Sequence, residues 1–217
     1  MNNREKNQSR REERQKQIYR GALKLFRKKG FHATSMREIA KASNVGLGNI
    51  YNYFKSKEDI LFLVHSNILG RLHQCFDESS KTYDHPVDQM VHVIRSIFEL
   101  TCQFKDEMLF VYTETKSLEG EYLHEILRQE AQFIADFQAM IERGVKLGVF
   151  DCRHPDLAAN IIVFNLSISP LRGWNMFPYH DAATMLEALT NFILRGLGVK
   201  REVPAPSLRS PLSSGSS

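Results

Sequence analysis

The chain has 217 residues, of which 42% are hydrophobic and 25% are charged, a globular composition that excludes disorder throughout. It has no run of about 18 apolar residues, and its polar first segment lacks the apolar core of a secretory signal, so we expect a cytoplasmic protein without membrane contact. Residues 1–60 hold 15 Lys and Arg against 6 Asp and Glu, a balance of +9, whereas residues 61–217 have a balance of −5. The net charge of +4 therefore hides a basic N-terminal region, typical of polyanion binding, on an acidic body.

Apolar residues recur at helical spacing along the chain, without an alternating strand pattern, so we predict an all-α fold. Ser35 and Glu38 have the spacing of a capping box at the start of a short helix, and Gly30 suits the end of the helix before it. A flexible basic arm is expected over residues 1–10. Four helices follow it: 11–29, 35–43, 47–53 and 56–79. Five longer helices follow: 86–104, 106–117, 119–147, 155–171 and 181–197. A Pro- and Ser-rich tail over 201–217 is expected to be disordered.

The second and third predicted helices, with the tight turn between them, form a helix-turn-helix motif, whose second helix enters the major groove of DNA. Its predicted underside is apolar: Ile39, Ala40, Val45, Ile50 and Phe54. Its outward positions carry small, amide and aromatic side chains, which can reach base edges and phosphates without a charge clash. These positions are Leu47, Gly48, Asn49, Tyr51, Asn52 and Tyr53. The basic run up to Lys16 is either a solvated helix end or a contact to DNA backbone or minor groove.

The segments TSMREIA (34–40) and VGLGNIYNYFKSKEDIL (45–61) resemble the TetR family of transcriptional regulators, and the resemblance covers about residues 12–62. It implies three N-terminal helices that bind double-stranded operator DNA and further helices that bind a small-molecule effector and form a homodimer. Where the family often has Ser or Thr, this chain has Gly46 and Asn49, so we expect a different operator from those of close relatives. The predicted DNA-binding residues are Thr34, Ser35, Arg37, Gly46, Leu47, Gly48, Asn49, Tyr51, Asn52, Tyr53 and Lys57. Between the arm and the tail we predict two domains: a DNA-binding domain over 11–55 and a ligand-binding and dimerisation domain over 56–200.

The helices expected over 155–171 and 181–197 carry broad apolar stripes, which indicates burial on more than one side. The resemblance implies that they form half of an intersubunit four-helix bundle, and the alternative is a core confined to one protomer. The predicted dimer-interface residues are Leu157, Ala158, Ile161, Ile162, Asn165, Leu186, Leu189, Phe192 and Ile193.

The aromatic residues between 86 and 174 predict a roomy apolar cavity with a few polar groups, which suits a small-molecule effector. The candidate ligand-binding residues are His92, Phe98, Tyr112, His124, Arg128, Phe133, Phe137, Asn165 and Trp174. A loose similarity to regulators of fatty-acid, sterol or aromatic catabolism implies an acyl-CoA-like effector. The predicted function is therefore a repressor that such an effector releases from its operator.

A thiol- or metal-responsive regulator on the same fold is the alternative. Cys75, Cys102 and Cys152 are odd in number and widely spaced, so no disulfide framework is expected. His65, His73 and Cys75 come closest to a metal cluster, but their spacing fixes no third ligand. An enzyme is least expected, because the sequence has no nucleophile elbow, phosphate loop or zinc-protease motif. We therefore assign no catalytic residue, metal or cofactor.

Overall fold

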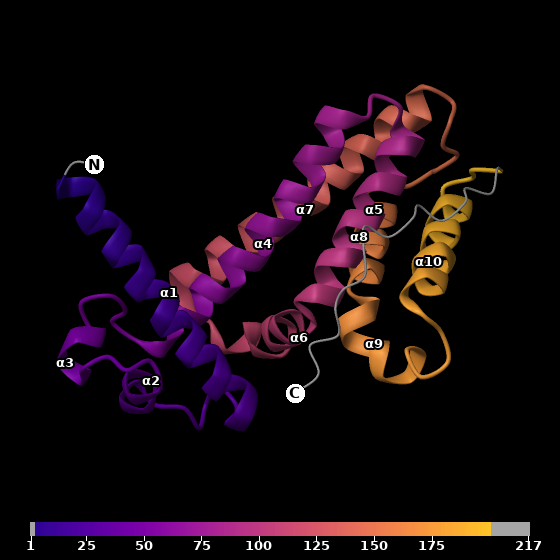
Figure 1. Ribbon diagram of the computed structural model, residues 1–217. Helices are drawn as coiled ribbons and strands as arrows, with labels where there is room; N and C mark the ends of the chain where they lie inside the picture. Colours follow the sequence, from indigo (N-terminus) through magenta and orange to yellow (C-terminus); the bar gives the residue numbers. More distant parts are fainter. Residues whose placement is uncertain (1–2, 201–217) are drawn as a thin grey trace. The chain divides into compact units, whose positions relative to one another are not determined.

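The computed structural model describes residues 3–200, which fold into helices (Figure 1). The elements are α1 (Asn3–Lys29), α2 (Met36–Ala42), α3 (Leu47–Ile50), α4 (Lys57–Thr82), α5 (Pro86–Gln103), α6 (Lys105–Glu114), the 3₁₀ helix η1 (Thr115–Ser117), α7 (Gly120–Lys146), α8 (Pro155–Leu166), α9 (Ile168–Met176) and α10 (Ala182–Gly196). The predicted all-α fold is confirmed. Across the described part, none of the helices has both the length and the apolar character needed to cross a membrane. The tail predicted over 201–217 lies outside the described residues.

Contacts between residues divide the chain into two compact units. Among the described residues, unit 1 comprises 3–67 and 109–126, and unit 2 comprises 68–108 and 127–200. The boundaries fall inside α4, α6 and α7, so each of these helices contributes to both units. The functional boundary between residues 55 and 56 stays a prediction. The division by contacts was not predicted, because a local pattern cannot show that a segment near residue 120 packs with the N-terminal helices.

Unit 1 is built on a core that α1, α2 and α3 share, since α1 packs on α2 and α2 packs on α3. The side chains buried in it are Ile18, Ala22, Phe26, Ile39, Ala40, Ile50 and Phe54. The Phe26 ring stacks on Phe110, with ring centroids 5.1 Å apart and planes 8° apart. This contact ties the 109–126 segment to the core of the N-terminal helices.

Helix α1 begins at Asn3, so residues 3–10 are helical where the sequence predicts a flexible arm. The segment has no Gly or Pro before Gly21 and is rich in Arg, Gln, Glu and Lys, which favour helices. Gln8 Nε2 also donates to Glu12 Oε1 at 2.8 Å, a pair four residues apart on the helix surface. The basic side chains of the N-terminal region are therefore carried on a helix.

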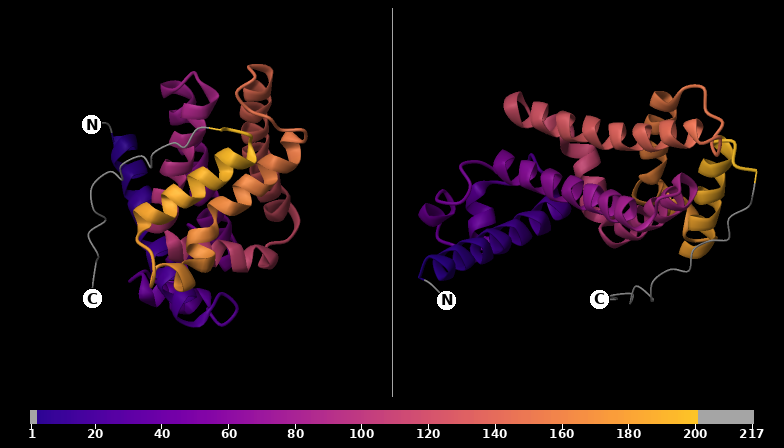
Figure 2. Two further views of the ribbon diagram at one scale, coloured as in Figure 1. Left: turned by 90° about the vertical axis from the view of Figure 1, so that its right-hand side faces the viewer. Right: turned by 90° about the horizontal axis from the view of Figure 1, so that it is seen from above.

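Unit 2 has α5 against α8, α9 and α10. The left-hand view of Figure 2 shows α8 and α10 running side by side. The helix expected over 155–171 is interrupted at Ser167, which separates α8 from α9. Pro170 explains the break, because it has no N–H to donate to Leu166, whereas the first turn of a new helix tolerates proline.

Candidate functional site

A capping box fixes the start of α2, as the sequence predicts. Ser35 Oγ accepts a hydrogen bond from the Glu38 N–H at 3.4 Å, and Glu38 Oε2 accepts one from the Ser35 N–H at 3.0 Å. Lys29 Nζ lies 2.5 Å from Glu38 Oε1. The hydrogen bond from Lys29, followed by those from Ser35, lowers the pKa of Glu38 to about 2. Glu38 therefore stays ionised and joins the end of α1 to the start of α2.

The turn between α2 and α3 uses a left-handed residue to reverse the chain tightly. Asn44 has φ +49°, a conformation that Asn adopts more readily than most residues. The Val45 N–H donates to the Ala40 carbonyl at 2.9 Å, which closes the turn. Gly46 then stands at the N-cap of α3 in an extended conformation without a side-chain cap. The two short helices are thus held by backbone bonds, as a helix-turn-helix requires.

The outward surface of α3 and the residues after it is polar around the exposed side chains of Leu47 and Tyr51. Ile50 and Phe54 are buried beneath it, as predicted. Asn52 Nδ2 donates to Asn49 Oδ1 at 3.2 Å, so the two amides share one edge of the helix. The exposed residues are Gly46, Leu47, Gly48, Asn49, Tyr51 and Asn52, and Tyr53 is half-buried. We call Leu47, Gly48, Asn49, Tyr51 and Asn52 the recognition surface, and Arg37 on α2 is exposed as well.

Two residues predicted to contact DNA form hydrogen bonds within unit 1. Thr34 is buried and its Oγ1 donates to the Gly30 carbonyl at 2.8 Å. Lys57 Nζ lies 3.0 Å from the Phe31 carbonyl, 3.2 Å from that of His32 and 3.3 Å from that of Thr34. An ammonium has three N–H donors, so Lys57 uses them all to hold the connection between α1 and α2. The sequence could not show this, because the partners lie 23 to 26 residues away.

A close approach of α1 to the end of α2 positions the motif on its support. Gln17 Nε2 donates to the Ser43 carbonyl at 2.6 Å, and Ser43 Oγ donates to the Ile18 carbonyl at 3.5 Å. A Cβ on Gly21 would lie 2.2 Å from Ser43 Oγ, so a glycine is needed at this crossing. The contact fixes α1 against the helix-turn-helix.

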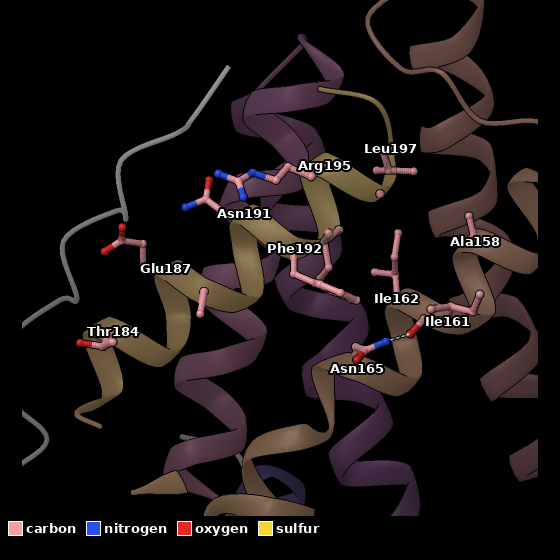
Figure 3. A pocket seen from close by; sticks show the side chains of 13 residues that line it. Ala158, Ile161, Ile162, Asn165, Thr184, Glu187, Asn191, Phe192, Arg195 and Leu197 are labelled. Atoms are coloured by element: carbon pink, nitrogen blue, oxygen red, sulfur yellow. Dashed lines mark hydrogen bonds between the residues drawn. The ribbon is translucent and has the colours of Figure 1, made fainter. Parts of the chain in front are cut away.

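Unit 2 has an apolar surface over α8 and α10. We call the exposed side chains Leu157, Ile161, Phe164 and Phe192 the α8–α10 face. A groove of about 800 Å³ runs over it, with Ile161 and Ala158 on one wall and Phe192 and Asn191 on the other (Figure 3). An apolar surface of this kind marks an interaction site.

The residues predicted for the dimer interface divide between this face and the protomer core. Leu157, Ile161 and Phe192 are exposed, and Ala158 and Asn165 are half-buried. The other four are buried: Ile162, Leu186, Leu189 and Ile193. Leu186 is 0% exposed, which corrects its assignment, since it can support the face from beneath but cannot touch a second copy. An apolar stripe broader than one helix face includes both core and interface positions, and the spacing of its residues does not distinguish the two.

The residues predicted to bind ligand do not gather around one cavity. Phe98 and Asn165 line a common cavity of about 400 Å³ between α5, α8, α9 and α10. Phe133 and Phe137 belong to the buried core of unit 2, and His92 is buried against Ser79, whose Oγ lies 2.7 Å from its Nδ1. The remaining four are elsewhere: Tyr112 and His124 in unit 1, and Arg128 and Trp174 exposed in unit 2.

Sequence reasoning missed most of the lining of this cavity. Ile168, Met176, His180, Thr184, Met185, Ala188, Leu189 and Phe192 complete it. Asp181 caps α10 by accepting a hydrogen bond from the Thr184 N–H at 2.8 Å, and this bond lowers the pKa of Asp181. The Asp181 N-cap was a usable signal for where α10 starts, but no local signal indicates which side of α10 meets α5.

The alternative prediction of a thiol- or metal-responsive regulator depends on cysteines and histidines, several of which are buried or paired within the fold. Burial raises the pKa of Cys75 to about 11 and also raises that of Cys102, which disfavours the reactive thiolate. His65 Nε2 lies 2.7 Å from Thr115 Oγ1, and His73 Nδ1 lies 3.5 Å from Asp136 Oδ2. Over residues 3–200 no group of three His, Cys, Asp or Glu side chains could hold a metal ion.

Comparisons with known proteins agree with this geometry. A model of the bacterial regulatory proteins of the tetR family matches residues 18–64, and a model of the tetracyclin repressor-like C-terminal domain matches residues 83–167. The HTH-type transcriptional regulator HbdR of Aromatoleum sp. (strain CIB) is 34% identical over 110 residues, which cover 51% of this chain. The match spans 48% of HbdR, about half of that relative's length.

Two solved structures share the fold. A bacterial regulatory protein in the tetR family from Rhodococcus RHA1 has a TM-score of 0.79 and 20% identity, covering 87% of this chain and 98% of its own. AibR, in complex with isovaleryl coenzyme A and operator DNA, has a TM-score of 0.67 and 18% identity, covering 85% of this chain and 97% of its own.

Proposed function

The chain belongs to the TetR family of bacterial regulatory proteins, and we propose that it acts as a homodimeric repressor that a small acyl-CoA-like effector releases from its operator. Its family consists of ligand-responsive DNA-binding transcriptional regulators rather than enzymes. The repressor role, the homodimer and the effector class are the proposed parts.

The proposal rests on the presence of two exposed surfaces of different chemistry on one chain. The recognition surface presents amide and tyrosyl side chains, two of which follow α3, together with Gly48 and the exposed Leu47, above a buried apolar underside. The α8–α10 face presents large apolar side chains to solvent. A helix-turn-helix protein reads two half-sites about one DNA turn apart when two copies associate. A second copy of the chain on the α8–α10 face supplies that pair.

DNA binding and assembly are tested with the full chain and a random-sequence duplex pool. We expect light scattering to give a dimer, and repeated selection from the pool to recover duplexes with two inverted half-sites. Recovery of duplexes without a consensus would contradict operator recognition. A monomer that binds one half-site would contradict the homodimer.

The cavity of about 400 Å³ in unit 2 is our candidate for the effector site. Phe98, Ile168 and Met185 give it an apolar body, while Asn165 and Thr184 add polar groups. Ligand sites commonly combine an apolar lining with a few polar groups and have volumes of about 300–1,000 Å³. The complex of AibR with isovaleryl coenzyme A suggests the ligand class.

Effector binding and dimer geometry share residues, which gives the proposal a mechanism. Asn165, Thr184, Ala188 and Phe192 line both this cavity and the larger groove of the α8–α10 face. A ligand that changes their positions would favour one packing of the two copies over another. Dimers whose recognition helices no longer match adjacent major grooves would then leave the operator.

The effector is tested with isovaleryl-CoA, a longer straight-chain acyl-CoA and free coenzyme A. An acyl-CoA that binds the native state should raise the melting temperature and release the selected duplex in a mobility-shift assay, since ligand binding stabilises the folded form. Met176→Trp, which fills the cavity, should abolish both responses. The neighbouring Asn175→Trp does not alter the lining and should keep them. Equal responses in both variants would place the effector elsewhere, and no response to any probe would exclude the acyl-CoA class.

A further inference from the structure

A second polar surface lies beside the recognition surface in unit 1. A groove of about 730 Å³ lies between the first half of α1 and the residues that follow α3. Arg10, Arg11 and Arg14 come from α1, and Asn52 and Tyr53 come from the other side. Asn52 belongs to both surfaces, so the groove continues the recognition surface toward α1.

The chemistry of this groove matches a polyanion. The lining contains three guanidinium groups and one carboxylate, that of Glu13. Its other side chains are amides and a tyrosine. The three arginines are exposed. Arginine presents a planar fork of donors that fits phosphate oxygens, and amide and tyrosyl groups add neutral hydrogen bonds to the same oxygens. None of the residues that line the groove is aliphatic.

The basic side chains are held in position by a helix that is anchored to the motif. Gln17, at the end of the groove, donates to the Ser43 carbonyl at the C-cap of α2, and Arg14 Nη1 donates to Gln17 Oε1 at 2.9 Å. From Asn3 to Gln17 the helix extends for about 21 Å, at 1.5 Å per residue. A helix of this kind orders its charges before binding, whereas a flexible arm loses conformational entropy when it docks.

The α1 wall of the groove lies outside the region that the family model matches, which begins at residue 18. The arginines are therefore not part of the matched helix-turn-helix.

We propose that this arginine groove binds the phosphodiester backbone of the operator next to the major-groove half-site that α3 contacts. The inference rests on the DNA-binding function and adds a second contact to it. Arg10, Arg11 and Arg14 bind phosphates, and Asn52 and Tyr53 connect that contact to the recognition helix. Since phosphates carry no sequence information, the groove raises affinity for any duplex and fixes the orientation of the head without changing the preferred sequence.

The test compares two triple variants of the full chain. Arg10→Gln, Arg11→Gln and Arg14→Gln remove the groove charges, and glutamine keeps the helix because its propensity is close to that of arginine. The control changes three exposed basic residues of the same helix that do not line the groove, Lys16, Arg20 and Lys24, to Gln. Both variants lose the same net charge, so a general field effect would act on them equally.

The readout is the salt dependence of binding to a duplex selected by the wild-type chain and to a scrambled version of it. Each lost phosphate contact should reduce the slope of log K against log salt by about 0.9, so the groove variant should lose about 2 to 3 units of slope per protomer. Its affinity should fall by the same factor on both duplexes, at least tenfold at low salt, while the ratio between them stays constant. The control variant should keep the wild-type slope to within one unit.

The outcomes separate this inference from the proposed function. A wild-type chain without preference for its selected duplex would overturn operator recognition itself. A selective wild-type chain together with equal slopes for the two triple variants would overturn the arginine groove alone. Loss confined to the selected duplex would also overturn it, because the arginines would then read bases rather than phosphates.

Discussion

The recognition surface and the α8–α10 face are built in opposite ways. On α3 and the residues that follow it, mostly polar and small side chains face outward together with Leu47, while Ile50 and Phe54 are buried beneath them. On α8 and α10, Ile161 and Phe192 are 59% and 65% exposed above the buried Ile193. Apart from the exposed Leu47, the aliphatic side chains of α3 are thus covered within one chain, whereas those of the α8–α10 face are left for a partner. Folding of the head and assembly of the dimer should therefore be separable.

The largest effect is expected when charge is placed on the α8–α10 face. Ile161→Glu with Phe192→Glu should leave a monomer, because a docked second copy would bury unpaired carboxylates. Affinity for a selected duplex should fall by about 10²-fold or more, since two linked binding modules gain this much over one. Light scattering and mobility-shift titration measure the two effects.

Val145→Glu with Leu147→Glu is the matched control. Both side chains are exposed, Leu147 to 61%, and neither lines the α8–α10 groove. This variant should remain a dimer with wild-type affinity. A dimer that survives Ile161→Glu with Phe192→Glu would place the second copy on another surface.

The second prediction tests whether unit 1 has a stability of its own. Thr115 Oγ1 donates to the Val111 carbonyl at 2.7 Å, so it accepts its bond from His65 Nε2–H, and His65 Nδ1 carries the lone pair. His65 is buried, and in the described part of the chain that Nδ1 has no hydrogen-bond partner. Burial lowers the pKa of His65 from 6.5 to about 4.

The sign of the pH dependence follows from which state takes up the proton. Between pH 6.5 and 4 the unfolded chain binds a proton that the folded chain excludes, so stability is full above pH 6.5 and is lost as pH falls toward 4. The loss is up to about 3 kcal/mol, at about 1.4 kcal/mol per pKa unit. Urea unfolding at several pH values should show this window, and His65→Gln should flatten it.

The same window should persist in the Ile161→Glu, Phe192→Glu variant if unit 1 is independent of assembly. A window that disappears with the dimer would show that His65 is buried by association rather than by the fold of unit 1.

The third prediction concerns the recognition surface. Tyr51 is 50% exposed, so Tyr51→Ala removes an outward side chain without opening the core. Loss of one base or phosphate contact costs about 1–3 kcal/mol, so operator affinity should fall about 10- to 100-fold while the melting temperature and the dimer are unchanged. Tyr112→Ala is the control, a tyrosine of 55% exposure on α6. Equal losses in both variants would deny Tyr51 a contact with DNA.

The sequence predicted the parts of this molecule that depend on short-range patterns. The capping box of Ser35 and Glu38, the buried Ile50 and Phe54, and the exposed Tyr51 follow from spacing within a few residues. The roles of Lys57 and Leu186 did not, because each is set by side chains that the fold brings together from distant positions. Most of the lining of the unit 2 cavity was missed for the same reason, since the angle at which α10 meets α5 has no local signal. The helical start of α1 was predictable from its helix-favouring composition and was missed because the charge run suggested an arm.

The smallest effects concern two glycines inside helices, and they test how firmly α1 is seated on the helix-turn-helix. A Cβ on Gly21 would lie 2.2 Å from Ser43 Oγ and 3.1 Å from the Ser43 backbone nitrogen, whereas nothing lies within 4 Å of one on Gly70. Alanine favours a helix over glycine by about 0.5–1 kcal/mol, so Gly70→Ala should raise the free energy of unfolding by about that amount. Gly21→Ala gains the same term but loses about 1–3 kcal/mol to the forced separation of α1 and α2, so the net effect should be destabilising by about 1–2 kcal/mol. Urea unfolding measures both. If Gly21→Ala were as stable as Gly70→Ala, the close approach at Ser43 would not fix α1, and the arginine groove would lose the rigid wall on which its affinity for DNA depends.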